Sequence, residues 1–342
     1  MNAPEDTTNS SVSYEDYIPD EDFTSLLSTL WRVWFAGHYL SIGLGIVLNL
    51  WLLLAILTSR DIRARMRNKI VCSFCVLHLL NCLLFTPMEL EITRLMRLFH
   101  RVSCYVLSSV HHVLLMQDFI SNWTLVLLVI VFVAQICDYK PCARFKRSTI
   151  AIGTYALLAL PWVASLVTIP GITTPTFYSF VRNLNVSLAY FEGCIFVTSD
   201  AFLIIKSLDT MVPLLVAVGL LSAAVVLRRR RFTRGFSSGM QVELLDRGPE
   251  VDDHFGYTAA VVVTSVCDFA EALSFLELFE MGMKQRWIYS VVEIFLSETK
   301  VFLIVLPWLL FPDIRERVKT WRPWHCAKPG IDLTLVFKND HT

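Results

Sequence analysis

The chain has 342 residues, of which 55% are apolar and 18% are charged. An average soluble protein is roughly 45–50% apolar and about 25% charged. Its mean hydropathy is +0.55. Its formal net charge is zero, with 30 Lys and Arg balanced by 30 Asp and Glu. The apolar residues form long stretches, and a bilayer core takes about 20 helical residues to cross. This distribution excludes a soluble enzyme, a disordered chain and a nucleic-acid-binding protein.

Seven apolar segments predict seven membrane-spanning helices, at residues 35–57, 70–88, 104–136, 149–170, 203–227, 258–281 and 287–311. Helices are expected because a backbone in lipid must satisfy its own hydrogen bonds, and no segment alternates like a barrel strand. We therefore expect an all-α membrane protein in three parts. These are an extracellular tail over 1–33, a seven-helix domain over 34–311, and an amphipathic helix with a cytoplasmic tail over 312–342.

The basic residues predict how the chain is oriented. Lys and Arg are concentrated after the first, third and fifth segments, within residues 60–69, 140–147 and 228–234. The positive-inside rule places these loops in the cytoplasm and the N-terminus outside. Asn9 and Asn185 begin glycosylation sequons on the predicted outer side, so we expect both to be glycosylated. Asn122 begins a third match inside a predicted span, which we interpret as a chance match.

Nine cysteines are present, and the predicted topology separates them. Only Cys104 and Cys194 lie on the outer side, where conditions are oxidising. Two extracellular cysteines predict one disulfide, and two unpaired thiols are the alternative. No hydrolase triad, phosphate loop or metal cluster is visible in the sequence, so we expect neither an enzyme nor a cofactor.

Seven spans, an outer N-terminus and this disulfide together resemble the rhodopsin-like G-protein-coupled receptors over about residues 33–325. The motif positions that support the resemblance are Asn49 in the first helix, Asn81 where the second helix has Asp, Pro213 in the fifth, Pro307 in the seventh, and the amphipathic stretch from 313 to 321. The resemblance implies a multi-pass receptor of the plasma membrane. Its partners would be an extracellular ligand, membrane lipid and a heterotrimeric G protein or arrestin, but no nucleic acid.

The activation motifs of that family are missing. No arginine occurs between Val102 and Ala143, so the Asp-Arg-Tyr motif is absent. The sixth-helix Cys-Trp-x-Pro becomes Cys267-Asp268-Phe269-Ala270, and Leu306-Pro307-Trp308 stands in place of Asn-Pro-x-x-Tyr. We therefore expect an atypical receptor. The alternatives are a non-signalling decoy or scavenger of the same fold, and a transporter or channel, although no inverted repeat is visible.

The N-terminal tail is acidic and contains no Lys or Arg before Arg32. Tyr14 and Tyr17 are candidate sulfation sites in an acidic run that also contains Asp16, Asp20, Glu21 and Asp22. This composition resembles the tails of peptide and chemokine receptors, which implies a basic peptide or protein ligand steered by charge. A solvated, disordered tail without a partner is the alternative.

Among the charged residues within predicted spans, five stand out: Asp118, Asp268, Glu271, Glu298 and Lys300. Each costs about 2.5–3.5 kcal/mol at mid-helix, so we expect them to pair or to line a site. With Asn49, Asn81 and His111 they form a predicted polar network, for which a purely packing role is the alternative. We expect Lys300 to pair with Asp118 or Asp268.

The resemblance also implies a sodium site at mid-bundle. The family anchors sodium on a second-helix aspartate, but Asn81 is neutral. Asp118 is therefore the candidate sodium ligand, facing Asn81, unless it pairs with Lys300. His111 stands where receptors for biogenic amines carry an aspartate, so such a ligand is not expected.

Overall fold

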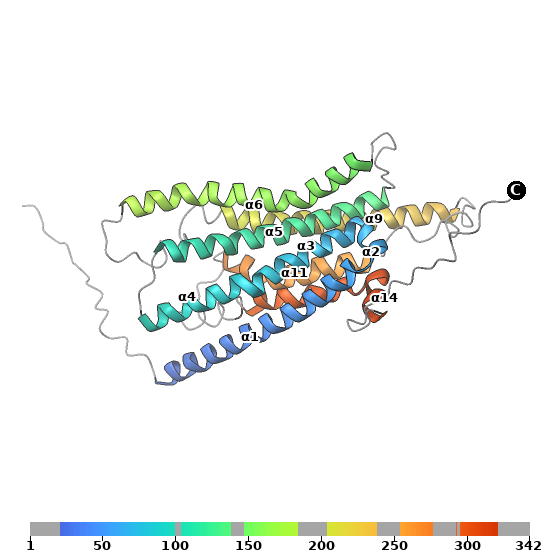
Figure 1. The fold of residues 1–342 in the computed structure, drawn as a ribbon. Coiled ribbons are helices and arrows are strands. Elements are labelled where there is room, and N and C mark those ends of the chain that lie inside the picture. Colours follow the sequence, from blue (N-terminus) through green and yellow to red (C-terminus); the bar gives the residue numbers. More distant parts are fainter. Residues whose placement is uncertain are drawn as a thin grey trace, which may run out of the picture.

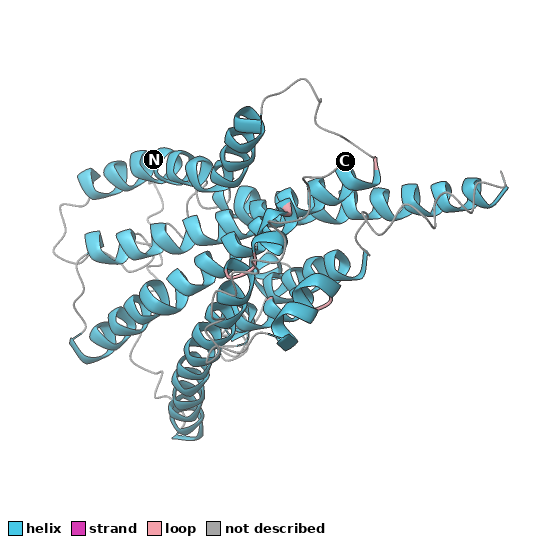
Figure 2. Cartoon of the chain, turned by 45° about the vertical axis from the view of Figure 1, so that its right-hand side comes forward, coloured by secondary structure: helices cyan, strands magenta, loops and turns pink. Residues whose placement is uncertain are grey.

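The computed structural model describes residues 21–99, 104–137, 147–183, 204–237, 254–275, 292 and 295–320. Within these ranges the chain is helical and contains no strand (Figure 2). The long helices run along a common direction as a bundle, and a short helix lies across one end (Figure 1). The expected all-α fold is confirmed for this part of the chain.

The elements follow one another with short breaks, and η denotes a π-helical turn. In chain order they are α1 (Glu21–Leu57), α2 (Arg60–Ala64), α3 (Met66–Leu80), η2 (Asn81–Phe85), α4 (Thr86–Phe99), α5 (Cys104–Ile136), α6 (Arg147–Asn183), η3 (Ser207–Met211), α9 (Val212–Ser237), α11 (His254–Phe275), α13 (Val305–Trp308) and α14 (Pro312–Thr320).

Within the described ranges, five helices are long and apolar enough to cross a membrane: Trp31–Leu57, Met66–Ile92, Ser108–Ile136, Ser148–Pro175 and Ile204–Arg230. A sixth candidate is the pair Phe295–Trp308 and Pro312–Thr320, which is bent by 96°. The structure is thus compatible with a multi-pass membrane protein. The count of seven spans and their orientation remain part of the proposal made below.

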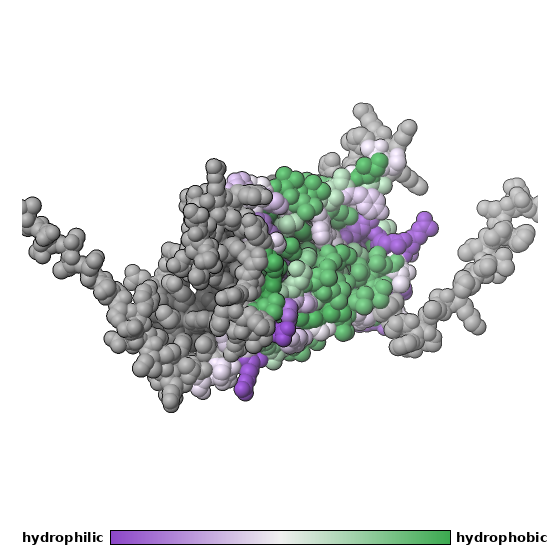
Figure 3. All heavy atoms as spheres, turned by 60° about the vertical axis from the view of Figure 1, so that its left-hand side comes forward, coloured by the Kyte–Doolittle hydropathy of each residue, from purple (hydrophilic) through white to green (hydrophobic). Residues whose placement is uncertain are grey.

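The outer surface of the bundle is apolar. Val167 on α6 is 69% exposed and Leu215 on α9 is 71% exposed, and Figure 3 shows a broad hydrophobic area over the middle of the molecule. An apolar area of this kind on a water-soluble monomer would drive association. Hydrocarbon chains of lipid are a compatible surrounding for it.

Helix α5 lies at the centre of the bundle and contacts α3, α6, α9 and α11. Its second half is buried, with Leu125, Leu128 and Phe132 fully excluded from solvent. Phe132 stacks on Tyr257 of α11 with ring centroids 4.3 Å apart. The buried polar side chains of α5, among them Ser121, Asn122 and Thr124, therefore face neighbouring helices.

Both π-turns lie just before a proline. η2 ends at Phe85, two residues before Pro87, and η3 ends at Met211, two residues before Pro213. Proline lacks an N–H and its ring clashes with the carbonyl four residues earlier in a regular helix. An extra residue in the preceding turn relieves this clash, and such π-turns occur frequently at functional sites.

The first helix begins earlier than predicted from the sequence, whereas the last one lies where it was predicted. Helix α1 begins at Glu21, so residues 21–33, which were expected to belong to the tail, are helical. Glu21 and Asp22 stand in its first turn, where negative charge is favoured by the helix dipole. Helix α14 occupies the start of the segment expected to form the short amphipathic helix, and it carries acidic residues first and basic residues last.

Candidate functional site: a buried charge network between four helices

A buried ion pair joins α11 to the Phe295–Trp308 segment. Lys300 Nζ lies 2.8 Å from Asp268 Oδ2 and 3.0 Å from Asp268 Oδ1. Both side chains are nearly excluded from solvent, at 6% and 3% exposure. Of the two partners expected for Lys300, the structure has Asp268. Pairing at this distance offsets the cost of removing both charges from water.

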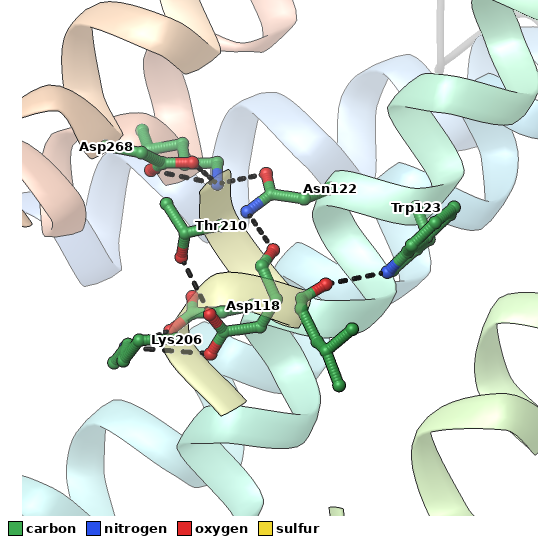
Figure 4. Close-up of polar contacts among 9 residues, drawn as sticks. Asp118, Asn122, Trp123, Lys206, Thr210 and Asp268 are labelled. Carbon is green, nitrogen blue, oxygen red and sulfur yellow. Dashed lines mark hydrogen bonds and ion pairs between the residues drawn. The ribbon is translucent and has the colours of Figure 1, made fainter. Parts of the chain in front are cut away.

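Asn122 on α5 connects this pair to the next helix (Figure 4). Its Oδ1 accepts a hydrogen bond of 3.2 Å from Lys300 Nζ, and its Nδ2 donates one of 2.8 Å to the backbone carbonyl of Asp209 in η3. Because the Asn122 amide is buried and bonded on both sides, a glycan has no room at this sequon. One side chain thus links three helical segments.

Pro213 explains why α5 side chains bond to the backbone of η3. The missing N–H of residue 213 would have bonded the carbonyl of Asp209 in α-helical spacing or that of Leu208 in π-helical spacing. Both carbonyls have donors from α5 instead: Asn122 Nδ2 at 2.8 Å and Trp123 Nε1 at 2.9 Å. The backbone groups freed by the proline are therefore satisfied by another helix, as buried carbonyls must be.

A second cation lies between two carboxylates at the start of the fifth candidate span. Lys206 Nζ is 3.8 Å from Asp118 Oδ2 on α5 and 3.7 Å from Asp209 Oδ2. Asp209 is fully buried, and its Oδ1 accepts a hydrogen bond of 2.9 Å from Thr210. Lys206 therefore holds α5 against η3 by charge, beside the bonds from Asn122 and Trp123.

Asn81, Asn49 and Glu298 make further contacts around these two pairs. Asn81 Oδ1 accepts a hydrogen bond of 3.0 Å from Thr86. Asn49 Nδ2 donates to the carbonyls of Gly45 and Val301 at 2.8 and 2.9 Å, which joins α1 to the Phe295–Trp308 segment. Glu298, one turn before Val301, faces His38 of α1 and Thr86 of α4. His111 is half-buried two turns before Asp118 on α5.

At the opposite end of the bundle, Arg67 fixes α14. Its Nη2 bonds both oxygens of Asp313, at 2.5 and 2.6 Å, and its guanidinium lies 4.1 Å from the centre of the Phe311 ring. Asn68 donates to the same carboxylate at 2.9 Å. Burial raises the pKa of Asp313, but Arg67, Asn68 and Arg65 lower it more, so its pKa lies below the usual value.

Sequence reasoning and structure agree on part of this network. Asp118 was expected to face Asn81, but the structure pairs Asp118 with Lys206 and Asn81 with Thr86. Lys206 and Asp209 belong to the network without being predicted, although both are charges inside a predicted span, the signal that identifies Asp268. Asn122 was set aside as a chance sequon, and nothing local in the sequence indicates that it bonds across helices.

Several expected sites cannot be placed. Outside the described residues lie Asn9, Tyr14, Asp16, Tyr17, Asp20, Asn185 and Cys194. The side chains of four further residues are likewise not described, namely Glu21, Asp22, Cys104 and Glu271. The proposed disulfide, the two glycosylation sites and the acidic ligand-binding tail therefore remain predictions.

The network joins helices by charge and hydrogen bonds and offers no cluster of metal ligands. Among the described residues, no group of three or more His, Cys, Asp or Glu side chains is arranged to hold a metal ion. A monovalent cation at Asp118 would compete with Lys206 for the same carboxylate. No family model matches the chain, and no curated protein matches it.

Proposed function

We propose that the chain is a cell-surface receptor of the seven-helix, G-protein-coupled type that responds to a basic peptide or protein ligand. The observation that carries the proposal is the buried network of Asp118, Asn122, Lys206, Asp268 and Lys300. It joins α5, η3, α11 and the Phe295–Trp308 segment through side chains instead of packing alone. A receptor requires such linked helices, because ligand binding at one end must shift their arrangement at the other.

In this proposal the N-terminus lies outside the cell, with glycans at Asn9 and Asn185 and a disulfide between Cys104 and Cys194. The acidic tail attracts the ligand, and α14 lies on the cytoplasmic side of the plasma membrane. Support for this orientation comes from the basic residues around α2 and at the end of α9, which the positive-inside rule assigns to the cytoplasm.

The test is second-messenger output and arrestin recruitment in cells that express the full chain, measured with a panel of basic peptides. We expect a peptide that elicits a response in the wild type to lose most of it when the tail before α1, residues 1–20, is deleted. The loss should shrink as salt rises, because steering by exposed charge is screened. A response that does not depend on any peptide, or none with the whole panel, would contradict the proposal.

A cation transporter is the second candidate, and one observation favours it. Asp118, Asp209 and Asp268 are three carboxylates against two ammonium groups within the network, and charged side chains inside membranes frequently mark ion or proton pathways. Proteoliposomes loaded with a pH or sodium indicator separate the two candidates. Flux that disappears in Asp118→Asn would favour the transporter, whereas peptide-dependent signalling without flux would favour the receptor. A decoy of the same fold would take up ligand without either output.

A further inference from the structure

Glu298 is a carboxylate that lacks a matching donor. Its Oε2 lies 3.4 Å from Thr86 Oγ1, but that hydroxyl has a single proton and a shorter bond, of 3.0 Å, to Asn81 Oδ1. Its Oε1 lies 3.9 Å from His38 Nε2, which is too long for a hydrogen bond. The side chain is only 12% exposed. A buried carboxylate is stable in its charged form only when a positive or donating group lies beside it.

His38 faces this carboxylate with an acceptor. Its Nδ1 lies 2.9 Å from the Trp34 carbonyl, which can only accept, so Nδ1 carries the ring proton and Nε2 of the neutral ring has a lone pair. Nε2 has no hydrogen-bond partner, and the residue is 1% exposed. The His38 ring packs on Trp34 with centroids 4.2 Å apart, which holds Nε2 toward Glu298.

Glu89 adds a second negative charge. It lies on α4, one turn beyond Thr86, and is near enough to Glu298 to repel it electrostatically. The cluster thus contains two carboxylates and a ring nitrogen, contributed by α1, α4 and the Phe295–Trp308 segment. Lys300, two residues after Glu298, is committed to Asp268 and Asn122.

We propose that Glu298, Glu89 and His38 form a binding subsite for a protonated primary amine. An ammonium nitrogen about 2.9 Å from each of two acceptors spans the 3.9 Å between His38 Nε2 and Glu298 Oε1. These two acceptors take two of its three N–H groups, and its charge compensates one of the two carboxylates. A transition-metal ion fits less well, because the described His, Cys, Asp and Glu side chains hold no three-ligand group.

The subsite lies at one end of the bundle. His38 is near the start of the span Trp31–Leu57, Glu89 is near the end of Met66–Ile92, and Glu298 is near the start of Phe295–Trp308. At about 1.5 Å per residue, His38 is roughly 10 Å inside its span. In the orientation proposed above this is the outer side, so the inference rests on the proposed function and names the group of a basic ligand that enters the bundle. The amine is held by α1, α4 and the Phe295–Trp308 segment.

The experiment measures the melting temperature of the purified full-length protein in detergent with methylammonium chloride. Tetramethylammonium chloride, which has the same charge and no N–H, and sodium chloride are the matched salts. We expect methylammonium to raise the melting temperature above either salt at equal concentration. The difference should disappear in Glu298→Gln and shrink in Glu89→Gln. Glu91→Gln is the control, because Glu91 is exposed and bonded to Arg94 on the same helix.

Replacing His38 separates this subsite from an internal ion pair. If His38 is an acceptor for the amine, His38→Ala weakens the methylammonium effect. If a charged His38 is itself the counter-ion of Glu298, His38→Ala frees the carboxylates and strengthens the effect, which would overturn the proposal. Equal melting temperatures in all three salts would also overturn it, since water alone would then fill the gap.

Tetralysine and its fully acetylated form distinguish the two sources of the amine. If tetralysine raises the melting temperature at a concentration at least about tenfold lower than methylammonium does, and the acetylated peptide has no effect, the amine is carried by a peptide. Equal potency points to a free small amine. If no amine raises the melting temperature, the subsite is refuted, while the proposed receptor function still stands for other ligands. If amines bind but no signalling is found, only the receptor function is refuted.

Discussion

Lys300 and Asp268, 32 residues apart in the sequence, meet inside the bundle with an N–O distance of 2.8 Å and with Asn122 as a third partner. Removing one member leaves the other charge buried and unpaired, which costs about 3–5 kcal/mol. We expect Lys300→Met or Asp268→Asn alone to lower the melting temperature strongly.

The double variant Lys300→Met/Asp268→Asn should recover much of that loss, because no uncompensated charge remains. Lys319→Met is the control, since Lys319 pairs with Glu316 on the exposed face of α14 and should change stability little. If the stability loss of the double variant equals the sum of the two single losses, Lys300 and Asp268 have no coupling energy.

Asp118 provides a test of sodium binding. Its carboxylate lies 3.8 Å from the ammonium of Lys206, so a sodium ion would have to compete with a tethered cation. We expect the wild type to melt at the same temperature in sodium chloride and in choline chloride, and Lys206→Met to melt higher in sodium chloride. Asp118→Asn combined with Lys206→Met should remove that difference. A sodium effect in the wild type that Asp118→Asn abolishes would show that sodium and Lys206 share the site.

Trp123 and Asn122 should be costly to replace because they satisfy carbonyls that Pro213 leaves without a donor. Trp123→Phe keeps the aromatic packing with Phe119 but removes the donor to Leu208, and an unsatisfied buried carbonyl costs about 1–3 kcal/mol. We expect a lower melting temperature for Trp123→Phe. Trp162→Phe is the comparison, because Trp162 Nε1 donates to the half-buried hydroxyl of Ser73, which can accept from another donor. An equal loss in both variants would argue against the role of Pro213.

The sequence indicates which types of residue form this network, but not which residues pair with one another. Asp268 and Lys300 could be identified because a charge within an apolar helix must find a partner, and the same rule applies to Lys206 and Asp209. The choice of Lys206 as the partner of Asp118 depends on how η3 rotates the helix before Pro213. The π-turn itself follows from Pro213, but the side of α5 that it faces depends on how the two helices pack, and the local sequence does not contain that packing.

Asp313 should make the anchoring of α14 sensitive to acid. Its folded-state pKa is lowered below the usual 3.8, since the bonds to Arg67, Asn68 and Arg65 outweigh the opposing effect of burial. A depressed carboxyl pKa contributes stability that is present above the unfolded-state pKa and is lost as the pH falls through the folded-state pKa. We therefore expect Asp313→Asn to melt below the wild type at neutral pH, and the two curves to converge below about pH 4.

Glu316→Gln on the same helix should not show this convergence, because Glu316 is exposed and pairs only with Arg315 and Lys319. The measurement is the melting temperature of each protein between pH 3 and pH 8, at about one pH unit per step. A gap between Asp313→Asn and the wild type that stays constant down to the lowest pH would mean that the Asp313 charge contributes nothing to the fold.

Gly45 marks the closest approach of three helical segments. A Cβ at this position would lie 2.5 Å from Cys82 Sγ of η2 and 2.7 Å from Val301 Cγ1 of the Phe295–Trp308 segment. Either contact is well inside van der Waals distance, so Gly45→Ala must push α1 away from both neighbours. The same shift would lengthen the bond from Asn49, one turn later on α1, to the carbonyl of Val301.

Gly43→Ala is the matched comparison, because it makes the same change two residues earlier on α1, where a Cβ would meet nothing within 4 Å. An exposed Gly→Ala change inside a helix stabilises by up to about 1 kcal/mol, whereas overpacking a core costs about 1–3 kcal/mol. We expect Gly43→Ala to melt at or above the wild type and Gly45→Ala to melt clearly below it. Cys82→Ala should partly rescue Gly45→Ala, since it removes the nearer of the two clashing atoms. Equal melting temperatures for the two glycine variants would show that α1 does not pack against η2 as the structure places it.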